Sequence, residues 1–151
     1  MIKITCLVEN TAKSPDIKSK HGLSLYVQTC NRKILFDVGP NDLFLKNAAK
    51  LGVDVASVDT VVISHGHVDH CGGLKCFFEA NKTAKVYVRP QAVQAHFVKV
   101  LGVPFYAGMD RSLPRERFVF TDDLCRLDDQ ITLFSDVFGQ FPLPKSDGNL
   151  L

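Results

Sequence analysis

The sequence lacks several features that would place it in a large functional class. Its 151 residues contain no Cys-x-x-Cys pair of the kind that structural zinc sites use. No apolar run approaches the roughly 20 residues needed to span a bilayer. The net charge is only +2, from 18 basic and 16 acidic residues, so no basic footprint for nucleic acid is present. We therefore expect neither a membrane protein nor a nucleic-acid-binding one.

A disulfide framework is also missing. The five cysteines are odd in number, and their spacing fits no bridging pattern. Free thiols are typical of a reducing compartment, so we expect a cytoplasmic protein. The chain runs from Met1 directly into a strand-like pattern, and we expect no cleavable leader.

The remaining composition indicates one compact domain, because 46% of the residues are apolar. Period-two patterns predict a meander of strands first, and then strands that alternate with helices. This order is typical of an α/β (α+β) fold, in which a mixed sheet carries helices on one face. We predict strands over 2–8, 23–29, 33–38, 59–64, 85–88, 118–120, 124–127 and 131–134, and helices over 42–51, from 74 and over 90–100. Residues 103–115 are expected to be irregular, and 139–151 to form a loop.

The most informative stretch is His65-Gly66-His67-Val68-Asp69-His70. A β-branched run precedes it and Gly72-Gly73 follows it, so the stretch is predicted to lie on a loop between a strand and a helix. Neutral imidazoles and carboxylates are good ligands for zinc, and also for iron or manganese. A surface loop that is merely rich in histidine would not explain the strand before it and the glycines after it.

The spacing divides the four side chains into two pairs. In extended backbone, residues two apart point the same way, so His65 and His67 can reach one ion together. Asp69 and His70 lie beyond the bend and can face a second ion. We therefore predict two divalent metal ions, zinc first, and iron or manganese as the alternatives.

This stretch matches the H-x-H-x-D-H signature of the metallo-β-lactamase-fold hydrolases. Within that superfamily the chain resembles the group of dihydropterin–ribofuranosylaminobenzene phosphate synthase. The segments that carry this resemblance are 7–10 (Leu-Val-Glu-Asn), 21–24 (His-Gly-Leu-Ser), 34–39 (Ile-Leu-Phe-Asp-Val-Gly), 65–70, 142–144 (Pro-Leu-Pro) and 148–151 (Gly-Asn-Leu-Leu).

The resemblance implies a metallo-β-lactamase-like αββα sandwich and a metal-dependent hydrolase. In such an enzyme two ions lower the pKa of a shared water, and the hydroxide attacks a phosphoryl or acyl centre. Asp69 would be the catalytic residue that orients this hydroxide. Asp37 would support the metal loop from behind. A small-molecule substrate that is phosphate-bearing or pterin-like is implied, and His21 is a candidate for lining its pocket.

The family takes further ligands from later in its chains, including a Gly-Cys-x-His stretch that is absent here. We therefore interpret residues 1–151 as one domain that is truncated before its C-terminal half. Two consequences are expected. The metal ions would bind at low occupancy, because each has two protein ligands, and this chain alone is expected to be weakly active or inactive. The bare sheet would drive self-association, or pairing with a missing C-terminal half.

Two other functions stay open. The chain could be a non-catalytic half-domain that pairs with itself or with a partner chain. It could also be a diiron redox protein of the same fold, although it contains no flavin-domain sequence. His96 is assigned to the predicted helix over 90–100 as a structural residue, and Cys71 is interpreted as a small packed thiol.

Overall fold

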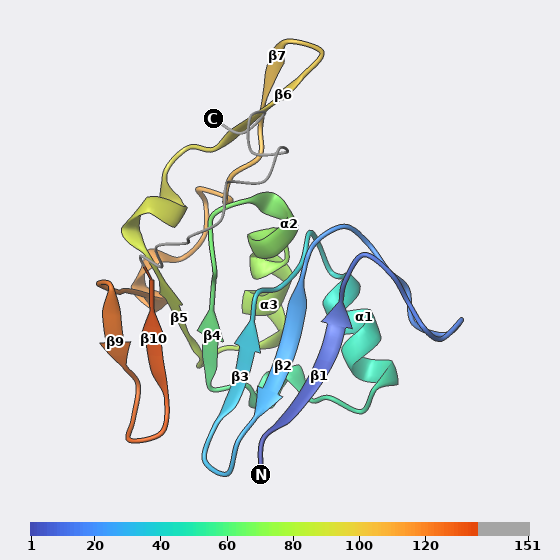
Figure 1. Ribbon diagram of the computed structural model, residues 1–151, viewed down its shortest axis with the longest axis vertical. Coiled ribbons are helices and arrows are strands. Elements are labelled where there is room, and N and C mark those ends of the chain that lie inside the picture. The colour runs from blue at the N-terminus through green and yellow to red at the C-terminus, as the bar shows by residue number, and fades with distance from the viewer. Residues whose placement is uncertain (136–151) are drawn as a thin grey trace, which may run out of the picture.

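A mixed sheet organises the computed structural model, which describes residues 1–135 (Figure 1). In these residues the main sheet has six strands in the order β1-β2-β3-β4-β5-β8. Their bounds are Lys3–Val8, Ser24–Gln28, Lys33–Phe36, Thr60–Val62, Lys85–Val88 and Phe118–Phe120. The predicted tail over 139–151, with two of the segments that carry the resemblance, lies outside the described residues.

The strand pairing in the sheet changes from antiparallel to parallel at β3. Strands β1, β2 and β3 are antiparallel neighbours, and the β2–β3 pair is the hairpin that the sequence predicts. Strands β3, β4, β5 and β8 are parallel to one another. The connection from β3 to β4 contains α1 (Leu43–Lys50), and the connection from β4 to β5 contains α2 (Val68–Cys71) and α3 (Leu74–Ala80). Parallel strands need such crossover connections.

The helices cover one face of the sheet, as Figure 1 shows. Leu35, Val61 and Val86 stand side by side in register on that face and are fully buried. They pack with Phe44 of α1 and Phe77 of α3 in one apolar core. The predicted mixed sheet with helices on one face is therefore confirmed. The carboxyl ends of β3, β4, β5 and β8 meet at one edge, and Asp37 and the signature follow β3 and β4 there.

The opposite face is covered only in part. A hairpin of β9 (Leu124–Arg126) and β10 (Thr132–Phe134) lies over β4 and β5 and forms with them an open pocket of about 410 Å³, lined on the sheet by Phe36, Val62 and Tyr87. The predicted strands over 118–120, 124–127 and 131–134 are thus confirmed. Toward β1 this face is open, and Ile4 is 63% exposed.

The predicted helix over 90–100 is wrong. A short 3₁₀ helix, η2 (Pro90–Val93), is followed by strand β6 (Phe97–Val100), which pairs with β7 (Val103–Tyr106) in a projecting hairpin (Figure 1). The predicted irregular segment over 103–115 therefore begins with a strand. The reason is the turn: Leu101 and Gly102 both have positive φ, 51° and 82°, as a two-residue hairpin turn of type I′ requires. Gly102 is a turn residue and does not end a helix.

None of the helices within residues 1–135 has the length and apolar character to cross a lipid bilayer.

Asn81 at the end of α3 ties the crossover to the sheet. Its buried amide donates to the carbonyl oxygens of Val55 and Val58 at 3.1 and 2.8 Å, and its Oδ1 accepts from the N–H of Ala84 at 2.8 Å. One side chain thus satisfies backbone groups on both sides of β4.

Asn81→Ala should lower the free energy of unfolding by about 2–4 kcal/mol, because it leaves buried backbone groups without partners. Urea unfolding followed by circular dichroism measures this change. Glu79→Ala, exposed on the same helix, is the control and should stay within about 0.5 kcal/mol of the unchanged chain. Equal stability of Asn81→Ala and the control would contradict this role.

Candidate metal centre

The signature lies where β4 leaves the sheet, at the carboxyl edge of the parallel strands. Ser64 and His65 come after Ile63, just beyond the end of the strand, and His67 precedes α2 with extended backbone. The prediction of a loop for this stretch is only partly right, because Asp69 and His70 lie on the single turn of α2. The turn brings these two side chains back toward His65.

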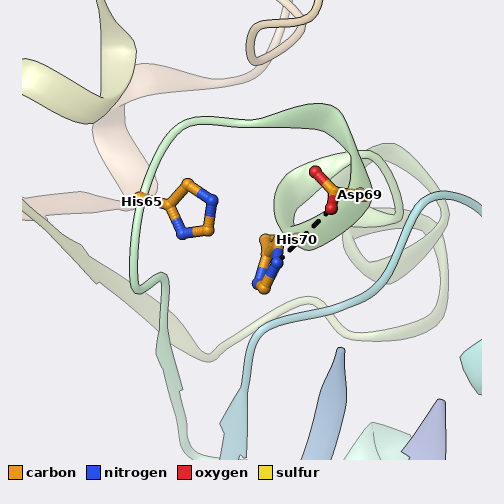
Figure 2. Close-up of side chains that lie close together, drawn as sticks. All are labelled: His65, Asp69 and His70. Carbon is orange, nitrogen blue, oxygen red and sulfur yellow. Dashed lines mark ion pairs between the residues drawn. The ribbon is translucent and has the colours of Figure 1, made fainter. Parts of the chain in front are cut away.

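Three side chains of the signature converge (Figure 2). Ligand atoms of His65, Asp69 and His70 all lie within 4.8 Å of one another. The rings of His65 and His70 have centroids 4.1 Å apart, and Nε2 of His70 lies 3.5 Å from Oδ2 of Asp69. Each of the three is partly buried, so one open side faces solvent.

Asp37 anchors this group from below. Its carboxylate is fully buried and accepts three hydrogen bonds: Oδ1 from the N–H of Ser64 at 2.8 Å, and Oδ2 from Ser64 Oγ and from His70 Nδ1, both at 2.7 Å. The Asp37 backbone has φ 56° and is held by its N–H to the oxygen of Val62 at 2.8 Å. The predicted supporting position of Asp37 matches these contacts.

These bonds fix which ring nitrogens can bind a cation. Because Asp37 only accepts, His70 must carry its proton on Nδ1. Ser64 Oγ gives its proton to Asp37, so Nδ1 of His65, 2.9 Å away, must donate to Ser64. In their neutral forms both rings therefore keep their lone pair on Nε2.

This donor set fits a metal ion. Nε2 of His70 and Oδ2 of Asp69 are both acceptors, yet they face each other at 3.5 Å. Only a shared proton or a cation satisfies two acceptors in this position. Imidazole nitrogens with a carboxylate oxygen are ligands typical of zinc and of several other divalent transition metals.

The pKa values of the three histidines of the signature are shifted in different directions. Burial lowers the pKa of His65, and positive charge on His70 and His67 would lower it further. Burial, followed by the proximity of His96, lowers the pKa of His67. For His70, burial acts to lower the pKa, but the hydrogen bond and charge of Asp37 and the charge of Asp69 outweigh it, so the pKa is raised. These directions favour neutral rings for His65 and His67, whereas at His70 a cation would compete with the proton that Asp37 and Asp69 stabilise.

The other candidate residues lie around this core. His67 is outside the convergent trio, and its ring is 4.8 Å from that of His65. His21 is largely exposed, with Nε2 3.3 Å from Oδ2 of Asp69. It lines a polar cavity of about 240 Å³ with Glu9, Asn10 and His70. The structure therefore brings His21 to the metal loop, from a segment far away in the sequence.

Sequence reasoning missed two neighbours of the site. Ser64 is the residue before the signature, and a hydroxyl in that position could have been noticed as a link to Asp37. His96 was hidden by the wrong helix over 90–100, and its ring is in fact 5.2 Å from that of His67.

Cys71 is a packed thiol, as predicted. Its Sγ donates to the carbonyl oxygens of Gly66 and His67 at 3.3 and 3.0 Å. Burial, with the negative charges of Asp37 and Asp69, raises its pKa to about 12. The thiol stays protonated at neutral pH and does not act as a thiolate ligand.

The sequence comparison decides the family. Residues 20–145 match the family model described as "Metallo-beta-lactamase superfamily". The chain belongs to this superfamily. Members of the superfamily are metal-dependent and act on small molecules, which agrees with the convergent donor group found here.

Two relatives come from Methanocaldococcus jannaschii. An uncharacterized protein is 43% identical over 79 residues, which are 52% of this chain and 30% of the relative. The enzyme named 7,8-dihydropterin-6-methyl-4-(beta-D-ribofuranosyl)-aminobenzene-5'-phosphate synthase is 34% identical over 104 residues, which are 64% of this chain and 35% of the relative. The predicted resemblance to this group is confirmed. The chain spans about a third of the length of these curated relatives.

A solved structure supports the same fold over most of the chain. It is titled Tm1679, a metal-dependent hydrolase of the beta-lactamase superfamily. It is 30% identical and superposes with a TM-score of 0.72 over 89% of this chain and 48% of its own.

Asp37→Asn should reduce zinc affinity by about 10- to 100-fold, because an amide group would oppose the donors of Ser64 or His70 and free the two rings to turn. Titration calorimetry with Zn²⁺ measures the change. Asp42→Asn, on the surface near the start of α1, is the matched control. Unchanged affinity in Asp37→Asn would show that the rings need no such support.

Proposed function

We propose that this chain carries the metal-binding part of a metal-dependent hydrolase whose site holds two divalent ions, zinc first. His65 and His67 would hold one ion, and Asp69 and His70 the other. The observation that carries this proposal is the convergence of His65, Asp69 and His70 above the buried carboxylate of Asp37.

Bound there, the ions would lower the pKa of a water molecule and neutralise charge developing on a phosphoryl or acyl centre. The side chains have distinct tasks. Nε2 of His65 and Nε2 of His70 are presented as ligands by the hydrogen bonds on their other nitrogens. Asp69 is the group that can orient a nucleophilic water through its second oxygen. His21, against Asp69, faces the cavity in which a substrate could lie.

One relative supports a proposal for the substrate class. The synthase named above acts in the chemistry of a pterin and a ribofuranosyl phosphate, according to its name. We infer a phosphate-bearing or pterin-like small molecule for this chain as well. All five cysteines are free, which supports the cytoplasmic location that we propose.

Hydrolysis of an activated phosphodiester tests this function. The zinc-loaded chain should cleave bis(p-nitrophenyl) phosphate above the rate in buffer with zinc alone. Asp69→Asn and His67→Ala should each lower that excess rate about 100-fold or more, and a chelator should remove it. Glu79→Ala should keep the full rate. Equal rates for all of these variants would contradict hydrolysis at this site.

A second candidate is a non-catalytic half-domain that pairs with a copy of itself or with a partner chain. The observation that favours it is the open part of the sheet opposite the helices. Ile4 is exposed there, and Leu25, Val27 and Phe36 are only partly buried. Soluble monomers rarely leave a contiguous apolar sheet face bare.

Light scattering after size exclusion tests the pairing. We expect a dimer that dissociates on dilution, because apolar area is removed from water on association. Ile4→Lys, on the open face at the edge strand β1, should shift the equilibrium toward the monomer, whereas Lys3→Gln beside it should not. A chain that stays monomeric at the highest reachable concentration would rule out self-association.

A further inference from the structure

His96 lies beside the metal loop, although it comes from a different crossover. It stands between η2 and β6, and its ring meets that of His67 edge to face, with centroids 5.2 Å apart and planes at 76°. The ring of His67 meets that of His65 in the same way, at 4.8 Å and 87°. Three imidazoles thus follow one another along the open side of the site.

The backbone holds the His96 segment against the signature. The N–H of Val68 donates to the oxygen of Ala107 at 2.7 Å, and the N–H of Ala107 donates to the oxygen of His96 at 2.9 Å. Gly66 makes this contact possible, because a Cβ there would collide with the carbonyl of Ala92 and lie 2.6 Å from His96 Nε2. The proximity of His96 and His67 is therefore built into the fold, and does not depend on two free side chains.

One ring nitrogen of His96 already makes a hydrogen bond. Nε2 lies 3.2 Å from the carbonyl oxygen of Gln91, and a carbonyl can only accept, so Nε2 carries the proton. In the neutral ring the lone pair is then on Nδ1. A ring that donates one N–H to a backbone carbonyl and keeps the other nitrogen free is the usual state of a metal-binding histidine.

The ring spacing agrees with shared coordination. With a zinc–nitrogen bond of about 2.0–2.1 Å, each centroid lies about 3.2 Å from the ion, and two centroids at the tetrahedral angle lie about 5.2 Å apart. The two ring pairs stand at 4.8 and 5.2 Å. Within residues 1–135, His65, Asp69 and His70 are the preassembled donors. Ligation by His67 and His96 requires their side chains to turn, and both are only partly buried.

We propose that His96 is a further metal ligand, which joins His65 and His67 through Nδ1 around the first ion. The inference rests on the proposed metal site and adds to it a third imidazole from this chain itself. An ion held by three histidines keeps a fourth position for water, which is the arrangement of catalytic zinc.

Zinc titration of the full 151-residue chain tests this assignment. His96→Gln keeps a polar side chain of similar size and should lower the affinity for the first Zn²⁺ about tenfold or more. Gln94→Ala, exposed in the same segment, should bind like the unchanged chain. Circular dichroism verifies that both variants are folded.

Nitrogen NMR of the histidine rings in the unchanged chain gives a second readout that needs no variant. On addition of Zn²⁺, the Nδ1 resonance of His96 should shift to the range of a coordinated nitrogen, while Nε2 keeps its proton. Zinc that binds without moving the His96 resonances, or with equal affinity in His96→Gln, would overturn the assignment and leave the proposed function standing. A chain that binds no Zn²⁺ at all would overturn both.

Discussion

The buried carboxylate of Asp37 is the constraint on which the candidate site depends. A charge with no exposed surface is tolerated only when its oxygens are fully hydrogen-bonded. Here the partners are the N–H and hydroxyl of Ser64 and the ring of His70. The same bonds that satisfy the carboxylate also orient the signature. The same set of contacts therefore determines both the stability of the sheet edge and the geometry of the donor side chains.

The sheet explains why these residues can meet. Asp37 follows β3 and Ser64 follows β4, and the two strands are parallel neighbours in register. Two segments that are distant in the sequence leave the sheet at the same edge, at adjacent positions. The segment between η2 and β6 contributes His96 in the same way, because it follows β5, the next strand along. The topology thus brings three loops to one edge of the sheet. Backbone hydrogen bonds from Val68 to Ala107 and from Ala107 to His96 hold the third loop against the signature.

The sequence predicted the parts whose signals are local and strong. The apolar run over 33–38, the β-branched run over 59–64 and the H-x-H-x-D-H stretch indicated the sheet, its edge and the donor residues. The family resemblance also supplied the position of Asp37. Local signals failed at 90–107, where Val93, Phe97 and Val100 have helical spacing but the Leu101-Gly102 turn reverses the chain. Because of that error, His96 was assigned to a helix and not to the surroundings of the metal loop. The tautomers of His65 and His70 depend on which atom of Ser64 faces which oxygen, and no spacing in the chain contains this information.

The backbone of Asp37 has a consequence for how this position can vary. With φ 56° it occupies a region that glycine enters freely and most side chains avoid. At this residue the backbone conformation favours glycine, whereas the hydrogen bonds of the site require a carboxylate. A glycine at this position would relieve the backbone strain but would remove the carboxylate that orients Ser64 and His70. An aspartate keeps those hydrogen bonds and retains the strained backbone conformation. At residue 37, the hydrogen bonds to Ser64 and His70 are thus made from a backbone conformation that is itself unfavourable.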